Sequence, residues 1–264
     1  MANEVERIVT MSVEEKNLWY GGNYSLVQFV DKYCFNEWQH RDHFINLNDF
    51  TNAIKYNGIC NAAASGDVNS FMILIEFTYN MWLLAYRHLT DENSSSKWQN
   101  NFYHLRDVMV DNLEIYNHTA FIDEDRVLII EAKPEVTAAA EIVEENLALD
   151  IIRYNHRSLQ GEIDLKKAIL FSLGSELEPK RKDLQVLNKQ LSEDIFYMLN
   201  NLNIRHNNRS KKDKNYKDFV AKMRKDRLEK WYDELYQMML LAFLLLDNVD
   251  RAKNIKELKA KITG

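Results

Sequence analysis

The stretch 118-HTAFIDEDRVLIIEAKP-134 decides the fold, because the spacing of apolar residues changes there. It contains two short β-type runs, Thr119 to Ile122 and Arg126 to Glu131, on either side of the acidic turn Asp123-Glu124-Asp125. Two such runs around a polar turn are typical of a β-hairpin. Pro134 ends the hairpin, because proline cannot donate a further ladder hydrogen bond and favours a helix start. The sequence therefore predicts one hairpin between two helical halves.

Helical spacing dominates on both sides of this hairpin. The apolar residues of 68–89 cover nearly the whole circumference of a helix, which predicts a central helix of a bundle. A helix is also expected within 23–40, where Leu26, Phe29, Val30 and Tyr33 have helical spacing, and another at 97–117, with a polar surface loop at 90–97. After Pro134 the pattern predicts helical stretches at 135–156, at 163–173 ended near Gly174 and at 179–202. It further predicts one long helix or two joined helices at 216–247 and a short last helix at 251–261.

The composition agrees with a mainly α fold, because the chain has only 7 Gly and 2 Pro in 264 residues and is 46% hydrophobic. We expect a helical bundle with one short β-hairpin. Its parts are an N-terminal helical region (1–118), the hairpin connection (119–134) and a C-terminal helical bundle (135–264).

The cysteine content, the start of the chain and the length of the apolar runs indicate a cytoplasmic protein. Cys34 and Cys60 are too few for a disulfide framework, and the start of the chain lacks the layout of a secretory signal. The longest apolar run, Met238 to Leu246, is shorter than the roughly 20 residues needed to cross a bilayer. We therefore expect no membrane partner.

The net charge of −6 hides a division along the chain. The basic segment, residues 205–230, has eleven Lys and Arg against four Asp and Glu, a net +7, so the remainder carries −13. A polyanion would be attracted to this segment. Alternatively, the lysines simply keep a surface loop solvated.

The start of the basic segment has residue types suited to phosphate chemistry. Arg205 offers a planar donor fork that matches phosphate, and His206 can exchange a proton near neutral pH. With the polar residues Asn207, Asn208 and Ser210, the pair can hold a phosphodiester and move protons without a metal or any other cofactor. A simpler interpretation is that His206 caps the preceding helix.

The IRHNN turn (204–208) after a long helix, together with the closing apolar run LLAFLLLD (240–247), resembles the HEPN domains of bacterial abortive-infection and toxin proteins. The resemblance covers the C-terminal half, 135–264. It implies a helical bundle that often dimerises. In active members it implies a metal-independent endoribonuclease that uses the arginine and histidine of an R-x(4–6)-H motif.

This chain departs from that motif. Counted from Arg205, the histidine would fall at Ser210, Lys211 or Lys212, and none of these is histidine. Either His206 takes over its role, or another histidine such as His156 (near Arg153) folds in, or the domain is inactive and only binds.

The predicted function is a metal-independent endoribonuclease, or another RNA-targeting effector, in a phage-defence or toxin-antitoxin system. The alternative is a catalytically inactive HEPN-like module that binds RNA or protein as a sensor, inhibitor or scaffold. We expect RNA as a partner, a homodimer and a regulatory protein partner. The predicted catalytic residues are Arg205 and His206, and the predicted RNA-binding residues are Asn207, Asn208, Arg209, Lys211, Lys212 and Lys214.

Two groups of residues have a weak similarity to metal sites. Cys34, His40 and His43 provide three potential zinc ligands where four are usual. The string DEDRVLIIEAK (123–133) is faintly similar to a D…ExK nuclease pattern, in which carboxylates bind Mg²⁺, but a nuclease of that kind needs more strands than one hairpin. No GxxxxGK[ST], GxGxxG or GxSxG motif is present, so nucleotide-hydrolase, dinucleotide-binding and serine-hydrolase readings have no support.

Overall fold

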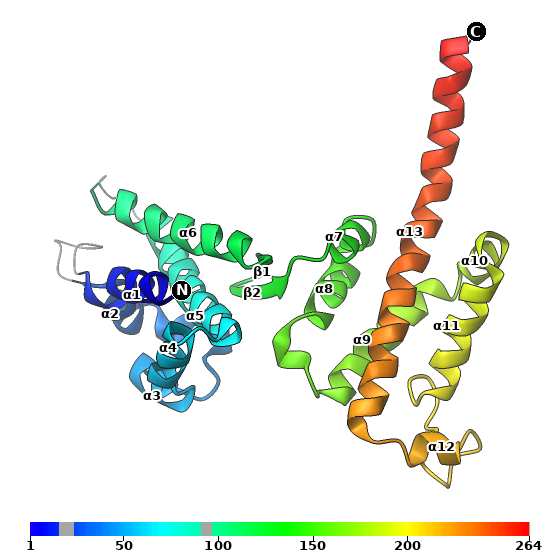
Figure 1. Cartoon of the computed structure of the whole chain (residues 1–264), viewed down its shortest axis with the longest axis horizontal. Helices are drawn as coiled ribbons and strands as arrows, with labels where there is room; N and C mark the ends of the chain where they lie inside the picture. Colours follow the sequence, from blue (N-terminus) through cyan, green and yellow to red (C-terminus); the bar gives the residue numbers. More distant parts are fainter. Residues whose placement is uncertain (16–23, 91–96, 264) are drawn as a thin grey trace. The chain divides into compact units, whose positions relative to one another are not determined.

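The computed structural model describes residues 1–15, 24–90 and 97–263. Most of the expected surface loop at 90–97 therefore lies outside the described residues. The chain divides into two units, Met1–Glu131 and Ala132–Gly264, so the hairpin belongs to the first unit. Within the described residues the fold is mainly α with one antiparallel hairpin, as the sequence predicted (Figure 1).

The first unit is built around α5 (Val68–Thr90), the predicted central helix. Phe71, Phe77 and Leu83 lie on three different faces of α5, and all three are buried. Around it, in chain order, are α1 (Ala2–Val9), a π-helical turn (Thr10–Glu14), α2 (Leu26–Tyr33), two 3-10 turns (Phe35–Glu37 and Gln39–Arg41), α3 (Leu47–Ala53), α4 (Tyr56–Ala64) and α6 (Lys97–Ile115).

Segment Val68–His88 of α5 is also, among the described helices, the one that is long and apolar enough to span a membrane. However, 78% of its most apolar window is buried inside the chain's own core. This burial is what a core helix of a soluble protein shows. A location in the cytoplasm itself stays a prediction.

The hairpin pairs β1 (His118–Asp123) with β2 (Arg126–Glu131) in antiparallel register, with Asp123 opposite Arg126 at the turn. Side chains of α5 bind the other edge of β2. Asn80 accepts from the amide of Val127 at 2.9 Å and donates to its carbonyl at 3.0 Å, and buried Glu76 accepts from the amide of Ile129 at 2.8 Å. A two-stranded hairpin is only marginally stable by itself, so these contacts with α5 help to stabilise it.

The second unit is a helical bundle. Its elements are α7 (Pro134–Ala140), α8 (Glu145–Tyr154), a 3-10 turn (Arg157–Leu159), α9 (Ile163–Leu177), α10 (Arg181–Leu187), α11 (Lys189–Asn201), α12 (Asp218–Ala221) and α13 (Lys225–Thr263). Helix α13 packs against α7, α9, α10 and α11, and its buried residues include Leu228, Leu235 and Met239. Its C-terminal part continues beyond the bundle (Figure 1).

Several predicted helix boundaries in this unit were wrong. The expected helix 135–156 is two helices, α7 and α8, and the expected helix 179–202 is broken at Asn188, whose side chain caps α11 by accepting from the amide of Leu191. The stretch 216–247, expected as one long helix or two joined helices, contains the short α12 and the first part of α13. The predicted separate helix at 251–261 is instead the continuation of α13.

Gly174 does not end α9, which continues to Leu177. A Cβ atom at Gly174 would lie 2.8 Å from both Cδ atoms of Leu199 on α11. The glycine therefore allows α9 and α11 to approach closely. This is a packing role rather than the helix-ending role that the sequence suggested.

Candidate functional site

The basic loop, residues 202–217, connects α11 to α12 and contains every predicted site residue. It leaves α11 through Asn203, which has a left-handed backbone conformation with φ of 63°. Asparagine tolerates this conformation better than most residues. Ile204 then enters the core, as expected, with only 4% of its surface exposed.

Arg205 points into the bundle. Its guanidinium donates a hydrogen bond to the carbonyl of Gly174 at 2.9 Å and forms an ion pair with Glu178. It also lies over the ring of Phe196, 5.3 Å from the ring centre, and 17% of its side chain is exposed. Arg205 thus joins α9 to α11, and its charge has a carboxylate partner.

His206 and Asn207, by contrast, are exposed. The backbone amide of Ser210 donates to Asn207 Oδ1 at 3.1 Å, which closes a turn. Within the described part of the chain, no hydrogen bond joins the side chains of Arg205 and His206. The structure therefore does not bring the two predicted catalytic groups together as a hydrogen-bonded pair.

Asn208 and Arg209 hold the loop in shape. Asn208 is fully buried, its Oδ1 accepts from the amide of Asn203 at 2.7 Å, and its Nδ2 donates to the carbonyl of Asn215 at 2.8 Å. The Arg209 guanidinium donates to the carbonyls of Ala221 and Met223. In this conformation the Asn208 side chain cannot contact RNA, contrary to the expectation, because both its polar groups are turned to the loop backbone.

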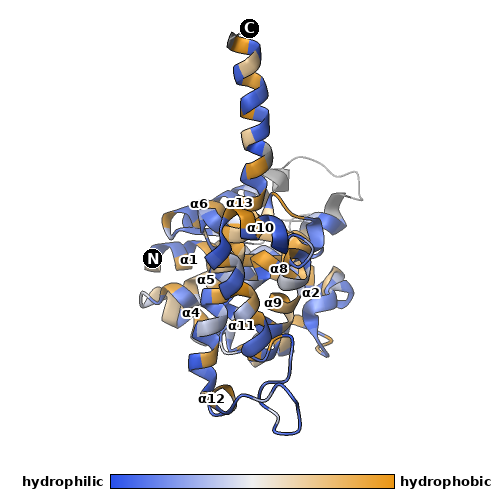
Figure 2. Cartoon of the chain, turned by 90° about the vertical axis from the view of Figure 1, so that its right-hand side faces the viewer, coloured by the Kyte–Doolittle hydropathy of each residue, from blue (hydrophilic) through white to orange (hydrophobic). Residues whose placement is uncertain are grey.

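The predicted lysines are on the outside of the loop. Lys211, Lys212 and Lys214 are exposed, and within the described residues none of them is in an ion pair. The neighbouring acid Asp213 instead accepts from the amide of Asn215 at 2.8 Å. Figure 2 shows the loop beside α12 as predominantly hydrophilic. These three ammonium groups are available to a ligand.

Two other cations of the basic segment are already paired with carboxylates. Lys222 pairs with Asp218 at 2.7 Å, and Arg224 pairs with Asp226 at 3.0 Å. The hydrogen bonds from Lys222 and Tyr216 lower the pKa of Asp218, which favours its charged form. Lys217, Lys225 and Lys230 are exposed as well, and among the described residues none of them is in an ion pair, so the usable positive charge extends from residues 211–214 into the start of α13.

The other histidine considered, His156, is buried with 3% of its surface exposed. Its Nδ1 contacts the hydroxyl of Ser158 at 2.7 Å and accepts from the Ser158 amide at 3.3 Å. It caps the 3-10 turn after α8. His156 therefore does not lie on an exposed helix face.

The structure supports neither of the two possible metal sites. Burial raises the pKa of the Cys34 thiol to about 12, and His40 pairs with Asp125 at 2.8 Å. His43 lies beside Asp42 at 3.1 Å. Among the described residues, no group of three or more histidine, cysteine or carboxylate side chains is placed to hold a metal ion.

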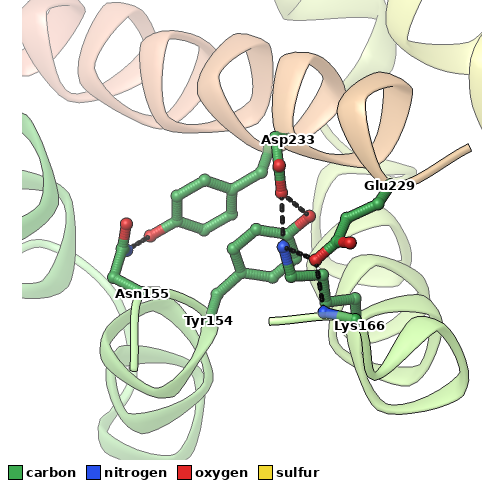
Figure 3. Close-up of polar contacts among 7 residues, drawn as sticks. Tyr154, Asn155, Lys166, Glu229 and Asp233 are labelled. Carbon is green, nitrogen blue, oxygen red and sulfur yellow. Dashed lines mark hydrogen bonds and ion pairs between the residues drawn. The ribbon is translucent and has the colours of Figure 1, made fainter. Parts of the chain in front are cut away.

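A polar cluster in the second unit was missed from sequence (Figure 3). Lys166 of α9 is buried, with 6% of its side chain exposed, and its Nζ lies 2.8 Å from Glu229 and 2.7 Å from Asp233 of α13. Tyr154 of α8 donates to Asp233 at 3.0 Å, and its ring stacks on Tyr236 at 4.1 Å. The cluster thus links three helices.

The hydrogen bonds in this cluster favour the charged form of Glu229. Burial opposes the ionisation of Glu229, but hydrogen bonds from Lys166 and from the amide of Gly161, 2.7 Å away, lower its pKa overall. Burial and the neighbouring Asp233 raise the pKa of Tyr154 far above its usual value, so this phenol stays protonated. Every polar group here has a partner, which indicates a role in joining helices.

A sequence signal for this cluster existed. Lys166 lies three residues after Ile163 and four before Leu170, on the buried stripe of α9, where a charged residue needs a partner. Glu229 and Asp233 are four residues apart and so lie on one face of α13.

Comparison with known proteins finds no protein-family model, curated protein or solved structure that matches the chain. The resemblance of 135–264 to HEPN domains therefore gains no support from these comparisons and stays a hypothesis.

Proposed function

We propose that this protein binds RNA through the basic loop. The observation that carries the proposal is the exposure of Lys211, Lys212 and Lys214 without ion-pair partners among the described residues. They lie in the basic segment, which carries a net +7 on a chain whose remainder carries −13. Lysines of this kind neutralise phosphates and release the counterions condensed on a nucleic acid.

The loop is also held in a defined conformation, which favours binding. The buried amide of Asn208 and the inward guanidinium of Arg209 fix the backbone on both sides of the lysines. A preorganised loop loses less conformational entropy when it binds than a flexible one. In this proposal Arg205 has a structural role, because its guanidinium is occupied by Gly174 and Glu178.

RNA binding without cleavage is thus the version that the geometry supports best, in keeping with an inactive HEPN-like module that acts as sensor, inhibitor or scaffold. The second candidate is a metal-independent endoribonuclease, favoured by the exposure of His206 next to the lysines. In that reaction His206 would take the proton of the ribose 2′-hydroxyl, and the oxygen would attack the adjacent phosphorus. The products would be a 2′,3′-cyclic phosphate and a free 5′-hydroxyl.

One experiment tests both candidates. Purified protein is incubated with labelled RNA in EDTA, and binding and cleavage are followed for the wild type, Lys211→Gln/Lys212→Gln and His206→Ala. We expect binding that the lysine variant weakens, with intact RNA. Cleavage that disappears in His206→Ala would establish the ribonuclease instead. The absence of binding would refute both.

The biological setting, a phage-defence or toxin-antitoxin effector held by a regulatory protein, is part of the proposal. Expression in a bacterial host tests it by growth. Toxicity that requires the loop lysines supports an effector, whereas equal growth of the wild type and Lys211→Gln/Lys212→Gln counts against it.

A further inference from the structure

The C-terminal end of α13 has an apolar stripe that the bundle does not cover. The helix extends past its neighbours at this end (Figures 1 and 2), and every residue from 251 to 262 is exposed. Three large apolar side chains on it are about half exposed or more: Ile255 at 52%, Leu258 at 55% and Ile262 at 73%. Their spacing of three and four residues places them on one face.

This stripe begins on the body of the bundle. Leu241 is 47% exposed and Leu244 is half-buried, and both lie outside the core cluster of the described residues, whereas their neighbours Leu240 and Phe243 are buried in it. The bundle of the same chain therefore covers most of this apolar run but leaves Leu241 uncovered.

The exposed stripe follows a heptad repeat. We define the seam as positions a and d of that repeat, which are Leu241, Leu244, Asn248, Arg251, Ile255, Leu258 and Ile262. Leucine or isoleucine occupies five of the seven positions. Isoleucine at a with leucine at d favours a two-stranded parallel coiled coil, and a single asparagine at a, here Asn248, is a device that selects dimers and fixes register. Asn248 is exposed, as such a residue would be before pairing.

Arg251 occupies the one d position of the seam that is not leucine, and its charge is already balanced. Arg251 forms an ion pair with Asp247 one turn earlier, at a flanking g position. Its guanidinium is thereby drawn toward the edge of the seam. Arg251 therefore need not face its counterpart across a paired helix without a partner.

We propose that this seam pairs with the same seam of a second copy, in parallel and in register. The inference is independent of RNA binding. A strictly a/d stripe is narrower than the apolar face of a membrane-surface helix, and the seam has no aromatic anchor. It also continues onto the body at Leu241, where a second helix can follow it but a flat membrane cannot.

The size of the seam predicts a weak dimer. From Leu241 to Ile262 it is about 33 Å long and about 10 Å wide. This strip of roughly 330 Å² per helix is well below the ~800 Å² per partner of a stable specific interface. We therefore expect a dissociation constant in the range of about 10 to 100 µM.

The charge of the tail predicts how salt affects pairing. Residues 251–262 contain five Lys and Arg and one Glu, a net +4. Parallel pairing brings two such tails within about 10 Å, comparable to the Debye length at 0.1 M salt. Salt should therefore tighten the dimer. Binding of the tail to an anionic membrane or to RNA would be weakened by salt instead.

Sedimentation of the full chain, treated with nuclease, tests the proposal at protein concentrations up to about 200 µM. We expect a reversible dimer that is tighter in about 500 mM than in about 50 mM NaCl. Ile255→Ala/Leu258→Ala should weaken it at least tenfold, while the matched off-seam variant Lys256→Ala/Glu257→Ala should not. A monomer throughout the range, or equal weakening by both variants, overturns the proposal.

A disulfide test checks orientation and register. Ile255→Cys should form a crosslink between residues 255 of two copies under mild oxidation, whereas the neighbouring Lys256→Cys should not. Equal crosslinking of both variants would contradict a parallel, in-register seam. Sedimentation with anionic vesicles covers the membrane alternative: association only when vesicles are present would also overturn the proposal.

Discussion

The guanidinium of Arg205 donates to the carbonyl of Gly174 at 2.9 Å, so a residue predicted to be catalytic joins two helices of the bundle. The same guanidinium pairs with Glu178. The bond connects the start of the basic loop to α9. It therefore separates two roles within one loop, because Arg205 stabilises the fold and the lysines are free to bind.

Arg205→Ala should lower the free energy of unfolding by about 1 to 3 kcal/mol, because it removes a part-buried hydrogen bond and ion pair. Urea unfolding measures this, with Arg224→Ala as the exposed arginine control. The RNA affinity of the folded Arg205→Ala variant should change less than about threefold. The loss of a phosphate contact would lower the affinity by more than about threefold. Unchanged stability with lost RNA binding would restore Arg205 as a functional residue.

Asn208→Ala should destabilise the protein by about 2 kcal/mol, because the buried amide of Asn203 and the carbonyl of Asn215 would each lose a partner. Asn207→Ala is the matched control, since Asn207 is exposed and makes one turn contact. We expect the control to cost less than half as much in the same urea titration. Equal losses would mean that burial of the Asn208 side chain is not what holds the loop.

Gly174→Ala is expected to destabilise the bundle by about 1 kcal/mol, because the new methyl group would press on the buried side chain of Leu199. This net loss combines a steric cost of about 2 kcal/mol with a gain of roughly 1 kcal/mol in helix propensity. In a Leu199→Ala background the clash is gone, so the same substitution should stabilise. Thermal unfolding of the four proteins gives the sign in each background, and the same sign in both would contradict the close approach.

The Lys166 cluster predicts a loss of stability in acid. The pKa of Glu229 is lower in the folded protein than in the unfolded chain, so its stabilisation is present above the unfolded pKa, about 4.5, and is lost as pH falls below it. Urea midpoints between about pH 6 and pH 3 should therefore fall less steeply for Glu229→Gln than for the wild type. Parallel slopes would mean that Glu229 is not coupled to folding.

Removing the cation of this cluster should be costly. Lys166→Met leaves Glu229 and Asp233 facing each other without a counter-charge, so we expect a loss of about 2 to 4 kcal/mol. Lys166→Met/Glu229→Gln/Asp233→Asn removes the repulsion as well and should recover more than half of that loss. Chemical denaturation measures the free energy of unfolding of both variants. Recovery of stability in the triple variant would show that the ion cluster is structural. No recovery would mean that the loss comes only from the packing of the Lys166 side chain.

Local patterns predicted the elements whose partners are near in sequence. The change to period two identified the hairpin, and the apolar circumference of 68–89 identified the central helix α5. Boundaries failed where tertiary contacts decide them. Gly174 was expected to end a helix, but its contact with Leu199, distant in sequence, makes it a close-packing position instead.

The site was predicted less well than the fold for the same reason. Exposure of Lys211, Lys212 and Lys214 follows from their charge. The inward turn of Arg205 depends on a carbonyl 31 residues away, which no spacing rule reveals. Only the buried position of Lys166 on an apolar stripe could have been found from the sequence pattern, and its partners on α13 could then have been sought among paired carboxylates.

The salt dependence of RNA affinity tests most directly whether the lysines of the basic loop contact phosphates. Fluorescence anisotropy with a single-stranded RNA would compare the wild type, Lys211→Gln/Lys212→Gln/Lys214→Gln and the control Lys180→Gln/Lys182→Gln/Lys189→Gln, which makes the same charge change on α10, α11 and the turn before them. If the three loop lysines contact phosphates, the loop variant should lower the slope of log affinity against log salt by about 2 and the control should not. Equal slopes for all three proteins, or no measurable binding by the wild type, would contradict the account.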